Sequence, residues 1–365
     1  MESIRTPTDA RWSCSGCGSC CRLYKLGPVE PEIIAGLEAR GVEAAWPAAA
    51  SGWATQETGP DGAAAWFLRH TAGHCVFLRD DNLCAIHALF GADAKPGFCR
   101  EYPFRVLRDP AGLVVIARPE CSAGPRRVID GQAVAEQAAE VLALPRVGAL
   151  NTWRPARVEP LAGVQLPLAR WMSWERALLD TLDVAGDLSP EAAVAALRTR
   201  LYGLAGERPK APTERVAALR VLVDALAELL TAAGQPSAGR STFERDLIEQ
   251  AGARLDLAAA RLSAGDRLDE PLAPDAARYL LVTLRGHVLG KSVHSLGSAA
   301  AGLGAFLLDA AIARTVGADP VSAAALAPRL PLWSRFTANQ AVRALLISRK
   351  AALVTLFESA APTEG

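Results

Sequence analysis

Charge of one sign is what this sequence lacks most clearly. Lys and Arg together number 39, as do Asp and Glu, so the net charge at pH 7 is zero. A protein that binds nucleic acid or an anionic membrane along its whole length carries an excess of basic residues. We therefore expect no nucleic-acid partner and no membrane surface. Half of the residues are hydrophobic, which exceeds the content of a disordered chain and predicts a folded protein.

Long hydrophobic runs are also missing. The longest uncharged stretch, Ser292 to Leu308, is shorter than the ~20 residues that a membrane span needs, and it is rich in Gly, Ala and Ser. The segment from Met1 to Trp12 has no apolar core of a secretory signal. We therefore expect a cytoplasmic protein. In such a reducing compartment, clustered cysteines serve as metal ligands or catalytic thiols more often than as disulfides.

Cysteine is absent from the whole C-terminal two-thirds of the chain and concentrated in the first third. The eight positions are Cys14, Cys17, Cys20, Cys21, Cys75, Cys84, Cys99 and Cys121. Within the run from Cys14 to Cys21, Ser and Gly alone separate the cysteines. Glycine permits tight turns of positive φ, in which sulfur atoms and backbone N–H groups can face one centre. The sequence therefore predicts a metal–thiolate site, with all eight cysteines as candidate ligands.

The four cysteines outside this run lie in short strand-like or loop-like segments. Residues 75–78 and 83–86 flank an Asp-Asp-Asn turn and predict a β-hairpin, with Cys75 and Cys84 near its open end. Residues 96–103, which contain Cys99, lie between two prolines and predict a loop. Cys121 follows a predicted strand over residues 113–117.

Three motifs in this order resemble a known family. They are the Cys14–Cys21 run, the Cys75-Val-Phe-Leu and Cys84-Ala-Ile unit, and Lys95-Pro-Gly-Phe-Cys-Arg-Glu-Tyr-Pro103. Residues 10–125 thereby resemble the CxxCxxCC, or YkgJ-type, cysteine cluster family, which implies a zinc- or iron-chelating domain. Two positions depart from the family pattern: His87 replaces an aromatic residue, and Lys95 replaces the usual Arg before Pro96.

The overall layout, a cysteine domain followed by a helical region, is similar to that of the flagellin lysine N-methylase. This resemblance implies S-adenosylmethionine as a cofactor and a protein lysine as substrate. However, we find no Gly-rich strand–turn–helix fingerprint for such a cofactor, and catalytic residues remain unassigned. Gly302-Leu-Gly304 lies in an apolar helical run and predicts close helix packing instead.

The all-thiolate donor set favours zinc or an iron–sulfur cluster over Mg, Ca or Mn. The spacing of Cys14, Cys17 and Cys20 begins like a bacterial ferredoxin run, which gives a slight preference for a 4Fe–4S cluster with a fourth, distant thiolate. Zinc stays open, with four thiolates or with help from His70, His74 or His87. Adjacent Cys20 and Cys21 fit two neighbouring centres, or leave one thiol free.

A thiolate centre of either kind has a formal charge of about −2. The basic residues that flank the cysteines and could offset it are Arg22, Lys25, Arg100, Arg105 and Arg108.

The fold class that we predict is α+β. A small, loop-rich, metal-bound cysteine domain with short β-strands (residues 1–130) precedes a larger all-α helical domain (residues 131–365). Because a small unit with many loops buries little apolar surface, we expect metal loss to unfold residues 10–125 and to spare the rest.

Helix signals fill the second part. Ser189 followed by Pro190 predicts a capped helix start, and Ser241 with Glu244 forms a capping box. Apolar stripes run along residues 216–230 and 243–262, an Asp-Pro pair at 319–320 predicts another start, and further helices fit 276–289, 298–316 and 338–358. No catalytic constellation stands out, and His287 and His294 are interpreted as packing or surface residues.

Three functions follow from these features. The first is a metal–thiolate protein whose metal holds the N-terminal domain and is redox-active. The second is a protein lysine N-methylase-like transferase, and the third is a zinc-stabilised helical scaffold that binds a protein partner.

Overall fold

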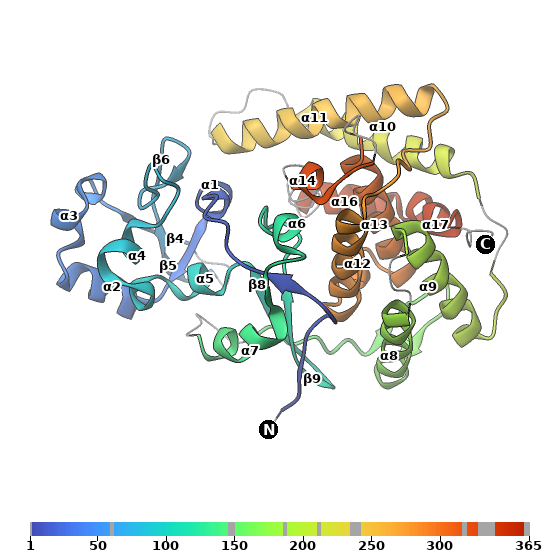
Figure 1. The fold of residues 1–365 in the computed structure, drawn as a ribbon, viewed down its shortest axis with the longest axis horizontal. Helices are drawn as coiled ribbons and strands as arrows, with labels where there is room; N and C mark the ends of the chain where they lie inside the picture. The colour runs from blue at the N-terminus through green and yellow to red at the C-terminus, as the bar shows by residue number, and fades with distance from the viewer. Residues whose placement is uncertain are drawn as a thin grey trace.

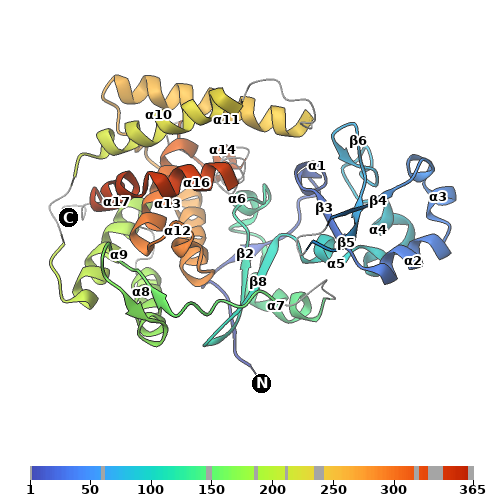
Figure 2. The ribbon, with the colours of Figure 1, turned by 180° about the vertical axis from the view of Figure 1, so that it is seen from behind.

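The computed structural model describes residues 2–58, 62–144, 150–184, 188–209, 213–233, 242–315, 320–327 and 340–360. Short strands and helices fill the N-terminal part, and long helices fill the C-terminal part, so the predicted α+β class is confirmed. Figure 1 shows a lobe of short elements at one end of the molecule and a bundle of helices at the other. A β-hairpin and two small helices lie between them, as the reverse view in Figure 2 also shows.

The lobe, which we call the cysteine lobe (residues 14–102), is built from short elements. These are α1 (Ser19–Leu23), β3 (Leu26–Val29), α2 (Pro31–Ala39), α3 (Val42–Ala45), η1 (Pro47–Ala49), β4 (Ala54–Thr58), β5 (Ala64–Leu68), β6 (His70–Thr71), β7 (His74–Cys75), α4 (Ala85–Phe90), η2 (Ala92–Ala94) and α5 (Gly97–Glu101). The three antiparallel strands β3, β5 and β4 form its sheet. Its core is a small cluster around Phe77, Trp53 and Leu37.

The middle layer, which we call the junction, consists of residues 2–12 and 104–144. Its elements are β1 (Ile4–Arg5), β2 (Arg11–Trp12), β8 (Phe104–Asp109), β9 (Gly112–Ala117), α6 (Gly124–Arg127), β10 (Gln132–Ala133) and α7 (Val134–Ala143). β8 and β9 form an antiparallel hairpin, and β1 adds to β9 in parallel. Leu107, Val114 and Ile116 of this hairpin pack against Leu289 of the helical part.

The helical domain (residues 157–360) contains a small hairpin and long helices. Its elements are β11 (Arg157–Val158), β12 (Leu166–Pro167), α8 (Leu168–Val184), α9 (Pro190–Ala205), α10 (Arg215–Ala233), α11 (Thr242–Ser263), α12 (Pro274–Leu289), η3 (Ser292–His294), α13 (Ala299–Ala313), α14 (Ala323–Leu326), α16 (Gln340–Ser348) and α17 (Lys350–Glu358). Helices α10 and α11 lie side by side across one edge of the molecule (Figure 1).

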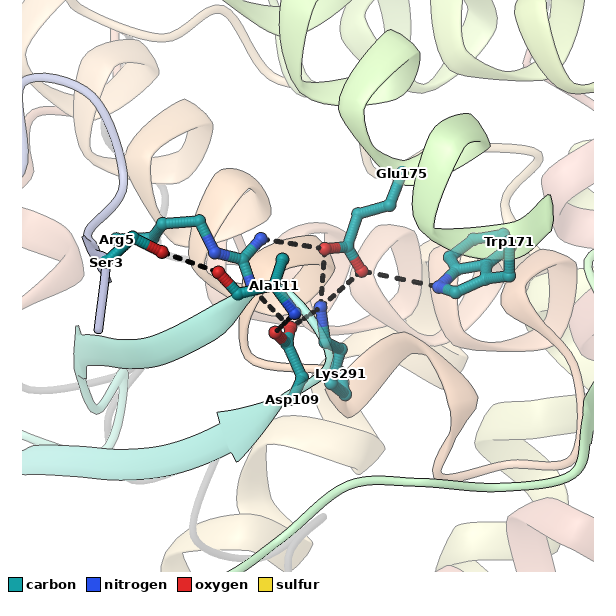
Figure 3. A network of polar contacts seen from close by, with 7 residues as sticks. All are labelled: Ser3, Arg5, Asp109, Ala111, Trp171, Glu175 and Lys291. Carbon is teal, nitrogen blue, oxygen red and sulfur yellow. Dashed lines mark hydrogen bonds and ion pairs between the residues drawn. The ribbon is translucent and has the colours of Figure 1, made fainter. Parts of the chain in front are cut away.

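A buried charge network ties the junction to the helical domain (Figure 3). The Lys291 Nζ lies 2.7 Å from Asp109 Oδ2 of β8 and 2.5 Å from Glu175 Oε1 of α8. Arg5 of β1 pairs with the same two carboxylates, and the Trp171 Nε1 donates to Glu175 at 3.3 Å. Burial opposes ionisation of Asp109, but Lys291 and Arg5 outweigh it and lower the pKa of this carboxyl.

Most helix predictions are confirmed. Ser189 caps α9 by accepting from the Ala192 N–H at 3.2 Å. The stripe on α10 is buried at Leu219, Val223, Leu226 and Leu230. Residues 251–262 of α11 likewise bury the apolar stripe, whereas the side chains of 243–247 and the capping residue Ser241 lie outside the described residues, as does Asp319.

The predicted helix 338–358 is divided in two at Arg349, whose backbone leaves the helical region.

The prediction that Gly302 and Gly304 allow close helix packing is confirmed. A Cβ at Gly302 or Gly304 would lie 2.0 Å from a carbonyl oxygen, that of Val293 or Leu353 respectively.

The predicted hairpin at 75–86 is wrong for its second half. A reversal does occur, since the Arg79 N–H donates to the Leu83 carbonyl at 2.9 Å and Leu78 bridges Cys84. Residues 85–90, however, form α4, because Ala-Ile-His-Ala-Leu-Phe is rich in good helix formers.

The predicted loop at 96–103 is also wrong, because residues 97–101 form α5. Pro96 lies at the N-cap, and Pro103 follows the end of the helix, positions that proline occupies readily beside helices. The predicted strand before Cys121 is confirmed as β9.

Candidate metal centre

Six of the eight cysteines surround one cavity in the cysteine lobe. The cavity has a volume of about 520 Å³ and is lined by Cys14, Cys20, Cys21, Cys75, Cys84 and Cys99. They come from three separate stretches: the Gly-rich loop with α1, the segment from β7 to α4, and α5. The structure thus brings six of the predicted ligands to one cavity, and their binding of a metal stays a prediction.

The Gly-rich loop reaches the cavity through two residues with positive φ. Gly16 and Gly18 have φ values of 63° and 65°. A Cβ on Gly18 would lie 2.5 Å from the Arg22 Nη1, so the loop passes directly beside the guanidinium. Arg22 donates to the Asn82 Oδ1 at 2.6 Å and to the Cys17 carbonyl at 3.3 Å, which fastens the loop to the reversal at 79–83.

Cys75, Cys84 and Cys99 are held by backbone elements rather than by loops alone. Cys75 ends β7 and is buried, and its Sγ accepts from the Phe77 N–H at 3.5 Å. Cys84 lies at the N-cap of α4. Cys99 lies within α5, whose first N–H, that of Gly97, donates to the buried Glu30 carboxylate at 2.9 Å.

Cys17 and Cys121 do not line the cavity. The Cys121 Sγ is buried and accepts from the Trp12 indole N–H at 3.3 Å. Burial raises the pKa of Cys121 more than the hydrogen bond from Trp12 lowers it.

The thiols differ in how readily they ionise. The Cys20 and Cys21 sulfurs lie 3.9 Å apart, and the hydrogen bond between them lowers the pKa of Cys20 to about 6 while raising that of Cys21. Burial raises the pKa of Cys75 to about 12 and also raises that of Cys99. A nearby positive charge is therefore needed before the buried thiols ionise together, which is what a bound cation supplies.

Cys17 behaves differently from the buried thiols. Its burial opposes ionisation, but hydrogen bonding to Ser19 and Ser15 outweighs that effect and lowers its pKa. The Cys17 Sγ lies 3.3 Å from the Ser19 hydroxyl.

The donor chemistry of the cavity fits zinc or iron. All eight cysteines are free thiols, and soft sulfur donors select these metals. Across the described part of the chain, however, no three His, Cys, Asp or Glu side chains stand in a ready-made metal-binding arrangement. Of the histidines near the cysteines, His87 lines the cavity, and the His74 Nδ1 lies 2.9 Å from the Cys75 carbonyl oxygen.

Most of the basic residues expected to offset a thiolate centre are engaged elsewhere. Lys25 pairs with Glu57 at 2.6 Å, Arg100 with Asp93 at 3.0 Å, and Arg108 with Glu2. The cavity wall contains Lys25 and also Arg79, Lys95 and Arg118, which the sequence analysis had not selected for this role. For Lys95, its place four residues before Cys99 was an available signal.

The comparisons with known proteins agree with this site. Residues 13–122 match the CxxCxxCC family model, described as "Putative zinc- or iron-chelating domain". The match contains all eight cysteines and ends before the helical domain. A search of curated proteins and a search of solved structures each found no match, so the similarity in layout to the flagellin lysine N-methylase stays a prediction. None of the helices in the described ranges is both long enough and apolar enough to span a membrane.

Proposed function

We propose that this protein binds zinc or iron through cysteine thiolates in the cysteine lobe, and that the metal stabilises that lobe. The observation that carries the proposal is the gathering of six thiols from three stretches around one cavity, within the residues that match a metal-chelating family. The all-thiolate set fits both a 4Fe–4S cluster and zinc.

In this proposal the cysteines fall into two groups. Cys20, Cys21, Cys75, Cys84 and Cys99 influence one another electrostatically and form the main ligand set, with Cys14 at the same cavity. Cys17 and Cys121 do not line the cavity and form the second group. Two neighbouring centres that use Cys20 and Cys21 separately fit this division.

The test is elemental and spectroscopic analysis of the full chain purified without oxygen. We expect iron with acid-labile sulfide and broad visible absorption, or zinc in stoichiometric amount in a colourless sample. Reversible bleaching of the visible absorption by a chemical reductant would add the redox role. Neither metal above trace would overturn the proposal.

Single Cys→Ser variants separate the two groups of thiols. Cys99→Ser, in the cavity, is expected to lose most of the metal. Cys121→Ser, as its matched control at the junction, is expected to keep the metal of the main set. The opposite pattern would place the main centre at the junction.

The transferase and the scaffold remain alternatives with their own tests. Saturable binding of S-adenosylmethionine by calorimetry would support a lysine N-methylase-like transferase, and its absence would remove that alternative. Stoichiometric zinc without redox activity would favour the scaffold.

A further inference from the structure

Four cationic side chains line the thiol cavity, and they divide into two pairs. Lys25 is ion-paired with Glu57 at 2.6 Å, and Arg79 with Asp81 at 2.7 Å. Arg118 donates from Nε to the Phe104 carbonyl at 3.4 Å. Among the described residues, the Lys95 ammonium forms no ion pair. Lys95 therefore brings a positive charge that is not ion-paired to a cavity wall that also contains Glu101.

The position of Lys95 is fixed by the backbone on both sides. Its N–H donates to the Ala92 carbonyl at 3.1 Å at the end of η2, and Ala94 and Pro96 beside it are buried. Gly97 then donates to the buried Glu30 carboxylate at 2.9 Å. The backbone on both sides of the half-buried Lys95 is therefore anchored at the cavity wall.

Lys95 lines the cavity together with thiols from two different stretches of the chain. Cys20 of α1 and Cys99 of α5 lie at the same cavity as its side chain. A positive charge at this position therefore borders both stretches of the main ligand set.

We propose that Lys95 is a positioning residue that stabilises the anionic metal–thiolate centre by its unpaired charge. The inference rests on the proposed metal-binding function. Four thiolates around zinc or around a 4Fe–4S cluster leave a formal charge of about −2, and a fixed cation in a partly buried site lowers the energy of that charge. Loss of the cation should therefore favour release of the metal and protonation of the thiols.

The experiment compares Lys95→Met with Lys25→Met, its matched control, in the full metal-loaded chain. Both variants remove a cavity-lining ammonium, but Lys25 is exposed and already neutralised by Glu57. Transfer of metal to an excess of a chromogenic chelator is followed by absorbance. We expect Lys95→Met to release metal about tenfold faster than the wild type, and Lys25→Met to stay within twofold. Lys95→Arg should restore slow release, because it keeps the charge.

The results separate the role of Lys95 from the metal-binding proposal. Release from Lys95→Met and from Lys95→Gln within twofold of the wild type would overturn the role of Lys95 while leaving the metal-binding proposal intact. A wild-type chain without metal would instead remove the proposed function itself. If Lys95→Met does not fold, the pair Lys95→Gln and Lys95→Arg gives the same comparison of neutral and charged side chains.

An iron–sulfur centre adds a second readout. One-electron reduction by dithionite makes the centre more negative by one charge, so the neutral variant should resist reduction more. A tenfold smaller reduction equilibrium constant corresponds to a midpoint potential about 59 mV lower. An unchanged potential would contradict the proposed charge effect.

Discussion

The cysteine lobe and the helical domain differ in what can hold them together. The main core, which lies in the helical domain apart from Val128, gathers 52 buried residues among those described, whereas the lobe's cluster gathers 14. Three of the partly buried residues that pack against the smaller cluster are themselves cysteines of the cavity, Cys21, Cys84 and Cys99. A larger core buries more apolar surface and can fold unaided. We therefore expect that the lobe depends on its proposed metal for stability and that the helical domain does not.

The largest expected effect is therefore that of metal removal. A structural metal adds on the order of 10 kcal/mol to the folding of a small domain. We expect chelation to raise hydrogen exchange throughout residues 14–102 and to leave α8, α9, α12 and α13 protected, as measured by mass spectrometry. Equal loss of protection in both regions would show that the helical domain depends on the metal as much as the lobe does.

The same experiment tests where the metal-dependent part ends. From the sequence we placed that end near residue 125. In the structure the β8–β9 hairpin packs on Leu289 and joins the network of Lys291. We therefore expect residues 104–117 to stay protected with the helical domain.

The second largest effect concerns the network that joins the hairpin to the helices. Lys291→Met leaves the buried carboxylates of Asp109 and Glu175 with Arg5 alone, and breaking a buried pair in this way costs about 3–5 kcal/mol. Chemical denaturation of the metal-loaded chain measures the loss. Lys350→Met is the matched control, because the Lys350–Glu159 pair is more exposed and its removal should cost about 1 kcal/mol or less. Similar losses in both variants would show that the network does not hold the junction.

How much the sequence could predict differs between the two regions. In the helical domain, local signals sufficed, since the hydroxyl of Ser189 and the apolar spacing on α10 act within a few residues. In the lobe, the gathering of thiols was predictable from their clustering. The partition that leaves Cys17 and Cys121 outside the cavity was not, because it depends on contacts such as that of Cys121 with Trp12, 109 residues apart.

The cations that lie near the thiols were also not predictable from the sequence. Lys25 was selected as an offsetting cation because it lies near the cysteines in sequence. In the structure Lys25 is ion-paired with Glu57, whereas Lys95 lines the cavity without an ion pair in the described part of the chain. The tertiary fold, and not the spacing along the chain, determines which of these cations forms an ion pair with a carboxylate.

The third largest effect is the loss of stability that we expect from a substitution in the Gly-rich loop. Gly18→Ala adds a Cβ at φ 65° and 2.5 Å from the Arg22 Nη1, so it combines backbone strain with displacement of the guanidinium. We expect a loss of about 2–3 kcal/mol, of which the strain accounts for about 1–2 kcal/mol. Gly62→Ala is the control, because φ is 82° there and nothing lies within 4 Å of the added Cβ. Thermal unfolding of the lobe distinguishes the two, and equal losses would mean that Arg22 does not fasten the loop.

The smallest effect is a pH dependence that belongs to the helical domain. Burial lowers the pKa of His287 to about 4, with the positive charge of Arg105 as a second cause, and its Nδ1 lies 2.8 Å from the Ser292 hydroxyl. Unfolding exposes this imidazole, whose pKa then returns to about 6.5. Below pH 6.5 the unfolded chain therefore binds a proton that the folded chain does not, and stability falls as the pH drops toward 4.

The slope is at most about 1.4 kcal/mol per pH unit, which amounts to about 2 kcal/mol at pH 5. Urea midpoints of the wild type and of His287→Gln at pH 7 and pH 5 measure it, and the variant should lose that part of the dependence. His294, whose burial lowers its pKa to about 3, should contribute in the same direction. Because neither histidine touches the thiol cavity, the difference between wild type and variant should persist after chelation. If the difference between wild type and His287→Gln vanished on chelation, the stability of the helical domain would depend on the metal in the cysteine lobe.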